Sequence, residues 1–186
     1  MTYEKKTTRS LVQDGLRLAG GVRDSRNREI ASARYEKALS LLPEEVLDSF
    51  LAGRYAVRII VMPDPQLPME MSIKVEDSGN KRRYTIFIYE EQCGWPEDRF
   101  LGALLRELGH VVAGKPPEDR WPQARGERAR FKEMLECKAD ALVWQWGLRH
   151  YSMSHLNATY PPHWVDRIVK QISEYMDSGE WHEVQR

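Results

Sequence analysis

The sequence predicts an α+β fold, in which a sheet of three or slightly more strands packs against helices. Two observations lead to this prediction. Residues 25–52 and 96–176 repeat apolar side chains at the three- and four-residue spacing of helices that bury one face. Residues 55–89, which lie between them, are rich in β-branched side chains and alternate apolar with polar positions, as strands do.

The size and charge of the chain restrict the classes of partner. Its 186 residues are enough for one domain with a buried core, and its 28 basic and 28 acidic residues give a net charge of zero. We therefore expect neither nucleic acid nor a membrane as a partner. The polar N-terminus lacks a signal-like apolar core and the two cysteines form no paired motif, which favours a cytoplasmic protein.

The first 53 residues are expected to be a tail followed by helices. Residues 1–10 are predicted to form a mobile tail, and residues 11–53 a helical segment that belongs to the same structural domain as residues 54–186. Within this segment the apolar spacing and the positions of proline and glycine predict three helices, at Leu11–Gly21, Ser25–Leu42 and Pro43–Ala52.

The middle of the chain predicts three strands, at Ala56–Met62, Met71–Val75 and Arg83–Tyr89. Residues Asp77–Asn80 have turn composition, so the second and third strands are expected to form a hairpin.

The second half of the chain predicts three further helices. The apolar stripes run over Pro96–Ala113, Gly126–Leu148 and Pro162–Met176, with a proline-containing loop at residues 114–122. We expect the first of these helices to lie on the sheet and the second to cross it.

The helix at residues 96–113 carries the main chemical signal. In the motif His-Glu-x-x-His, two histidines one helical turn apart share a zinc ion, and the glutamate activates the bound water. This chain has Arg106, Glu107 and His110 at the three positions of the motif. The next helix carries Glu-x-x-Ala-Asp, with Glu136 and Asp140 four residues apart on one helical face.

Taken together, residues 84–147 resemble the zincin metallopeptidases of the small gluzincin type. The resemblance implies that Glu107 occupies the general-base position, that His110 and Glu136 occupy zinc-ligand positions, and that Asp140 orients the ligands. It also implies a sheet edge that binds an extended peptide or protein segment by strand addition. From the sequence, we expect this edge to be the strand Arg83–Tyr89.

The departure from the motif lies at Arg106, where the family has its first zinc ligand. A guanidinium is always protonated and has no free lone pair for a metal. We therefore expect no cofactor, with zinc bound only if other residues retain the site. We also expect Arg106 to replace the cation, lying near Glu107 and Glu136 and neutralising carboxylates that would otherwise repel each other.

These residues favour a degenerate zincin-like metallopeptidase homologue that lacks zinc-dependent peptide hydrolysis and serves as a peptide- or protein-binding module. One alternative is an active metallohydrolase that holds its metal through His110, Glu136 and a further ligand. A second alternative is a structural or adaptor protein in which the motif is a coincidence and these side chains are ordinary helix residues.

Overall fold

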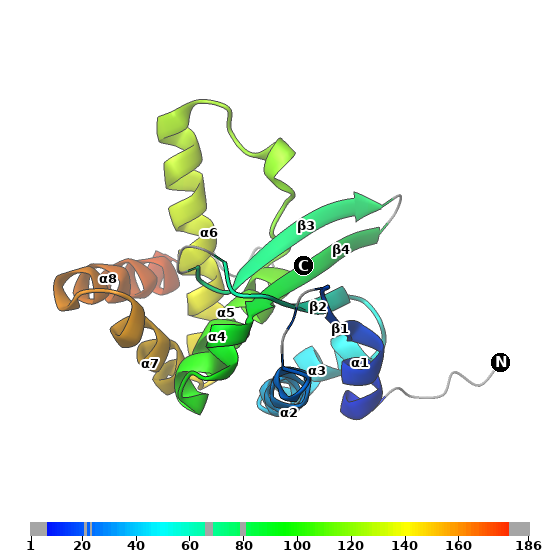
Figure 1. Ribbon diagram of the computed structural model, residues 1–186. Coiled ribbons are helices and arrows are strands. Elements are labelled where there is room, and N and C mark those ends of the chain that lie inside the picture. The colour runs from blue at the N-terminus through cyan, green and yellow to red at the C-terminus, as the bar shows by residue number, and fades with distance from the viewer. Residues whose placement is uncertain (1–6, 21, 23, 66–68, 79–80, 179–186) are drawn as a thin grey trace.

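The fold is α+β, with eight α-helices and a four-stranded mixed sheet in the part of the chain that the computed structural model describes, residues 7–20, 22, 24–65, 69–78 and 81–178 (Figure 1). The helices are α1 (Thr8–Gly15), α2 (Arg26–Ser40), α3 (Glu44–Leu51), α4 (Glu90–Cys93), α5 (Glu97–Val112), α6 (Arg125–Gln145), α7 (Arg149–Thr159) and α8 (Pro162–Ser178), with a 3-10 turn at Glu118–Arg120. The strands are β1 (Leu16–Leu18), β2 (Ala56–Met62), β3 (Ser72–Ser78) and β4 (Lys81–Tyr89).

The strand order in the sheet is β1-β2-β4-β3. Strands β1, β2 and β4 are parallel, whereas β3 pairs antiparallel with β4. The predicted hairpin is confirmed by this pairing, which brings Ser78 opposite Lys81. Of the expected turn, Gly79 and Asn80 lie outside the described residues.

The expectation that Arg83–Tyr89 forms the edge of the sheet is wrong. These residues belong to β4, which pairs with β2 along one side and with β3 along the other. Because an interior strand uses its backbone groups in both ladders, it has none left for a peptide. The two edges of the described sheet are β1 and β3.

One face of the sheet is packed against the helices. Ile59 and Val61 of β2 and Ile86 and Ile88 of β4 are completely buried, while the side chains between them are more accessible. This alternation is the two-residue period on which the strand predictions rested.

Helix α5 lies at the centre of the molecule. Every residue from Phe100 to Val111 is buried, because α2, α6, α7 and β3 all contact this helix. Its start fits the sequence, since Pro96 precedes the first turn and Glu97 and Asp98 place negative charge where the helix dipole favours it.

Two glycines of α5 allow its neighbours to approach closely. A β-carbon on Gly109 would lie 2.7 Å from the carbonyl oxygen of Ala139 in α6. One on Gly102 would lie 2.0 Å from the carbonyl oxygen of Tyr151 in α7. Real side chains do not tolerate such distances, so these glycines set the spacing between the helices that carry the site residues.

The predicted helix Gly126–Leu148 is shorter than expected. Helix α6 ends at Gln145 because Gly147 adopts a left-handed φ of 76°, a conformation that ends helices. The chain then turns into α7, a helix that the sequence analysis missed, and α8 follows close to its predicted position. No helix among the described residues is long and apolar enough to cross a bilayer.

The N-terminal prediction needs a similar correction. Residues 1–6 of the expected tail lie outside the described residues, but Thr8–Ser10 begin helix α1. Thr7 and Ser10 form a reciprocal capping box there. The helix ends at Gly15, and the next residues add β1 to the sheet instead of continuing the predicted helix.

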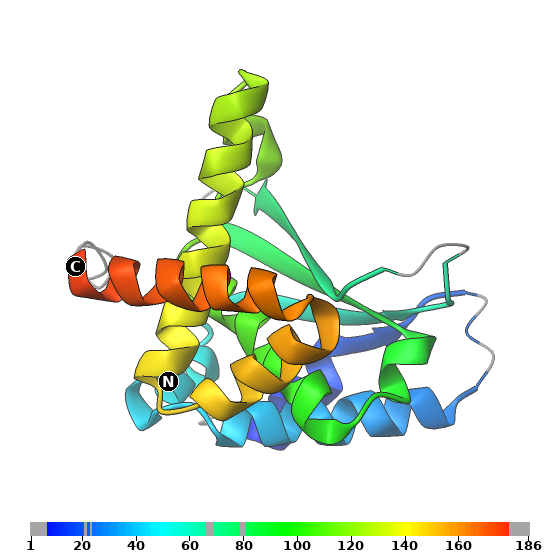
Figure 2. The ribbon, with the colours of Figure 1, turned by 90° about the vertical axis from the view of Figure 1, so that its left-hand side faces the viewer.

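The first turns of α6 project beyond the body of the molecule, next to the segment that follows α5 (Figures 1 and 2). Helix α8 lies across α6 (Figure 2). The projecting turns, the segment after α5 and strand β3 together form the walls of the cavities described below.

Candidate functional site

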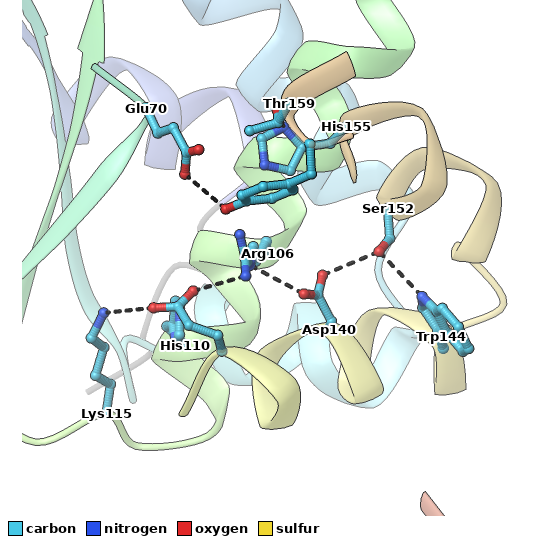
Figure 3. A network of polar contacts seen from close by, with 11 residues as sticks. Glu70, Arg106, His110, Lys115, Asp140, Trp144, Ser152, His155 and Thr159 are labelled. Atoms are coloured by element: carbon cyan, nitrogen blue, oxygen red, sulfur yellow. Dashed lines mark hydrogen bonds and ion pairs between the residues drawn. The ribbon is translucent and has the colours of Figure 1, made fainter. Parts of the chain in front are cut away.

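Helices α5 and α6 bring four of the predicted residues into one cluster. Figure 3 shows three of them, Arg106, His110 and Asp140, side by side. Arg106 and His110 lie one turn apart on α5, and Glu136 and Asp140 lie one turn apart on α6. The cluster is held by charged contacts between the two helices and is mostly shielded from solvent.

Arg106 is the cation at the centre of this cluster. Its Nη2 lies 3.0 Å from Oε2 of Glu136, and its Nε lies 3.2 Å from Oδ2 of Asp140. Burial alone would lower the pKa of Arg106. The carboxylates of Asp140 and Glu136 outweigh this effect and raise the pKa above the usual value of arginine. The guanidinium therefore carries its charge at every physiological pH.

Glu136 is shared between two partners on α5. The Oε2 that contacts Arg106 also lies 3.2 Å from Nε2 of His110, while Oε1 lies 4.0 Å from Nζ of Lys115. Burial raises the pKa of Glu136, but the Arg106 charge and the His110 hydrogen bond overcome it and hold that pKa well below its usual range. Glu136 is thus an ionised acceptor.

His110 is a neutral donor to that carboxylate. Burial lowers the pKa of His110 to about 4, even though Glu136 favours the charged imidazolium. With Nε2–H donating to Glu136, the other ring nitrogen carries the lone pair. This Nδ1 is buried and has no hydrogen-bond partner among the residues that the structure describes.

Asp140 connects the cluster to α7. Its Oδ1 accepts a hydrogen bond from Oγ of Ser152 at 3.1 Å, and that hydroxyl accepts one from Nε1 of Trp144 at 3.2 Å (Figure 3). Burial raises the pKa of Asp140, although Arg106 and Ser152 act in the opposite direction. Only 1% of this side chain is exposed, so Arg106 is its essential counter-charge.

Glu107 stands apart from the ion pairs. It is 7% exposed, and within the described part of the chain its Oε2 has no hydrogen-bond partner. Burial, followed by the charge of Glu136, raises the pKa of Glu107 to about 8. The sequence analysis expected Arg106 to neutralise Glu107 and Glu136, whereas the ion-pair partners of Arg106 in the described residues are Glu136 and Asp140.

The cluster opens onto a groove of about 480 Å³, which lies between the beginning of β3 and the projecting part of α6. Arg106, Glu107 and Glu136 line its floor. A second cavity, of about 730 Å³, continues along β3 from Ser72 to Asp77, and Lys115 contributes to both cavities. The open edge of the sheet therefore borders a continuous depression that reaches the cluster.

Sequence reasoning missed Lys115 and Tyr160. Lys115 follows Gly114, whose φ of 70° turns the chain back so that the Lys115 amide bonds to the His110 carbonyl. A glycine just after the C-cap residue of a helix, as Gly114 is after Ala113, is the signal that predicts such a reversal. Tyr160 lies at the end of α7 with its hydroxyl 3.5 Å from Glu70, and no sequence spacing relates it to Arg106.

The residues present do not fit a zinc ion at this position. Zinc requires three or more nitrogen, sulfur or oxygen donors around one point, and the position one turn before His110 is held by the guanidinium of Arg106. Its Nη2 lies 3.0 Å from the same Glu136 oxygen that faces His110, so the guanidinium supplies the positive charge beside this carboxylate. The described part of the chain has no group of three metal-ligating side chains.

Comparisons of the chain with models of known protein families, with curated proteins and with solved structures found no match.

Proposed function

We propose that this chain is a zincin-like metallopeptidase homologue that has exchanged its catalytic zinc for Arg106 and binds an extended peptide segment without cleaving it. The observation that carries the proposal is the contact of one Glu136 oxygen with both Arg106 and His110. In the peptidase motif, Arg106 stands at the first-ligand position, His110 at the second and Glu136 at the third, and the two helices bring them together.

The loss of hydrolysis follows from the chemistry of the guanidinium. Arg106 can neutralise Glu136 and Asp140, but it cannot bind a water molecule as a Lewis acid and lower its pKa. Glu107 would then have no metal-bound water to activate. The cluster is suited to hold the two helices together and to form the floor of a binding groove.

Peptide binding is supported by the free edge of β3. An extended segment that pairs with this strand would gain backbone hydrogen bonds along residues 72–77 and would lie in the depression that reaches Arg106. The edge strand proposed to bind the peptide is therefore β3, in place of Arg83–Tyr89.

Peptide selection tests this proposal. The purified chain is immobilised and exposed to a pool of acetylated, amidated twelve-residue peptides, and bound peptides are sequenced and checked for cleavage by mass spectrometry. We expect enriched, intact peptides. A backbone N-methyl scan of an enriched peptide should weaken binding at every second residue, because alternate amides face the partner strand.

Other outcomes would contradict the proposal in different ways. Cleaved peptides, together with one zinc per chain in elemental analysis, would indicate an active metallohydrolase. Enriched peptides that tolerate N-methylation at every position would rule out strand addition. Absence of any enrichment would remove the peptide-binding function.

A further inference from the structure

A third cavity, of about 320 Å³, lies between α6 and α8. Its apolar wall is formed by Ala129 and Cys137 of α6 and by Trp164 and Ile168 of α8, and charged side chains surround it. Trp164 is 46% exposed although it is a large apolar side chain. We call this cavity the side pocket.

The side pocket adjoins the groove beside β3. Arg106, Lys132, Glu136 and Tyr160 line both cavities, so these four side chains form a shared wall. A segment lying in the groove would therefore pass the mouth of the side pocket. A side chain that projects from the bound segment at that point could enter the side pocket and be buried there.

The charges around the side pocket cancel. Three basic side chains (Arg106, Lys132, Arg167) and three acidic ones (Glu133, Glu136, Asp140) line it. The basic and acidic charges of the cluster are already paired with each other, since Arg106 contacts both Glu136 and Asp140. The lining as a whole carries no net charge, so it does not favour an occupant of either sign, whereas an uncharged apolar occupant gains from burial against Ala129, Cys137 and Ile168.

We propose that the side pocket receives a bulky, uncharged apolar side chain (leucine, methionine or phenylalanine) from the peptide that pairs with β3. This inference rests on the proposed function and names its ligand class: an extended segment with one such residue opposite Tyr160. The occupant is a peptide because only a chain can combine an extended backbone at the sheet edge with a side chain in a separate cavity.

The test compares two phenylalanine substitutions on neighbouring positions of α6. Ala129→Phe fills the side pocket, and Arg130→Phe adds the same bulk at an exposed position outside the lining of the three cavities described. Wild type and both variants select from the same pool of twelve-residue peptides, and circular dichroism and urea unfolding check that each is folded.

We expect wild type and Arg130→Phe to favour leucine, methionine or phenylalanine over alanine at one position by about tenfold or more, the effect of burying such a side chain. Ala129→Phe should lose this preference while still binding the peptide backbone. Trp164→Ala, which widens the mouth, should shift the preference towards tryptophan.

The outcomes separate the two proposals. Enrichment without an apolar preference, or a preference that Ala129→Phe leaves intact, overturns the side-pocket inference and leaves peptide binding standing. No enrichment by wild type overturns both. A dimer in light scattering that Ala129→Phe abolishes assigns the pocket to a second copy of the chain and also overturns the inference.

Discussion

Replacing Arg106 by methionine tests whether the guanidinium is the counter-charge of the cluster. Methionine has a similar reach and no charge, so the substitution leaves Glu136 and Asp140 without the cation that lies 3.0 and 3.2 Å from them. Removing one partner from a buried charge pair costs about 3–5 kcal/mol, because the remaining charge stays desolvated. Asp140, at 1% exposure, has no access to water that would reduce this loss.

The assay is the free energy of unfolding from urea titrations at pH 7, with Arg120→Met as the matched control. Arg120 pairs with Asp77 at the surface and its side chain is 60% exposed, so its loss should cost about 0–1 kcal/mol. The triple variant Arg106→Met/Glu136→Gln/Asp140→Asn removes the uncompensated charges and should recover most of the stability.

The pH dependence gives a second readout. Arg106 and His110 hold the pKa of Glu136 below its usual range, so their stabilisation is complete above the unfolded-state pKa and is lost as the pH falls. The deficit of Arg106→Met should therefore shrink below about pH 5, as the carboxylates take up protons. A loss of less than about 1 kcal/mol at pH 7, equal to that of Arg120→Met, would refute the role of Arg106 as buried counter-charge.

Three further predictions concern the metal site, Glu107 and the helix contact. Arg106→His restores two histidines one turn apart facing Glu136, so this variant should bind about one zinc per chain in equilibrium dialysis. The control Arg106→His/His110→Ala should bind none. If Arg106→His also binds no zinc, the geometry of the site itself differs from that of a zinc site. The pKa of Glu107 is raised to about 8, so the folded state holds this proton between the unfolded pKa of about 4.5 and pH 8. The free energy of unfolding should then fall as the pH rises from about 5 to 8, by about 2–4 kcal/mol relative to Glu107→Gln. Parallel pH profiles of stability for the two proteins would contradict the raised pKa of Glu107. Gly109→Ala should destabilise the fold by about 1–3 kcal/mol, because its β-carbon would meet the Ala139 carbonyl. The control Gly126→Ala lies in open space on α6 and should stabilise the fold by about 0.5–1 kcal/mol. Similar thermal unfolding midpoints for the two variants would refute the close contact at Gly109.

The sequence predicted a helix or strand correctly where a single local signal, such as β-branched content or a proline and a glycine at the helix ends, was strong. Strand β2 was predicted residue for residue, because four of the seven residues in Ala56–Met62 are β-branched. Helix α5 was predicted to within one residue at each end, because a proline precedes it and a glycine follows it closely. Short elements such as β1 have too few residues for a period to appear, so they depend on the tertiary pairing of Leu16–Leu18 with β2.

The candidate site was predictable only as far as helix geometry reaches. The four-residue spacings of Arg106 with His110 and of Glu136 with Asp140 fix which side chains share a helical face. They do not fix which carboxylate meets the guanidinium. The contacts of Arg106 with Glu136 and Asp140 depend on how α6 packs against α5 at Gly109 and Ala139. Glu107 is the residue next to Arg106 on α5, and adjacent side chains of a helix do not face each other.

The glycine contacts of α5 also bear on how the groove adapts to different occupants. Gly102 and Gly109 lie two turns apart, so α7 and α6 rest on one stripe of α5, backbone against backbone. Backbone-to-backbone contacts are close-packed and cannot be compressed. The groove floor around Arg106 therefore cannot move when a larger peptide binds. Any accommodation must come from the outer turns of α6 and from the free strand β3, so tolerance for diverse sequences is confined to the rim while the base keeps a constant shape.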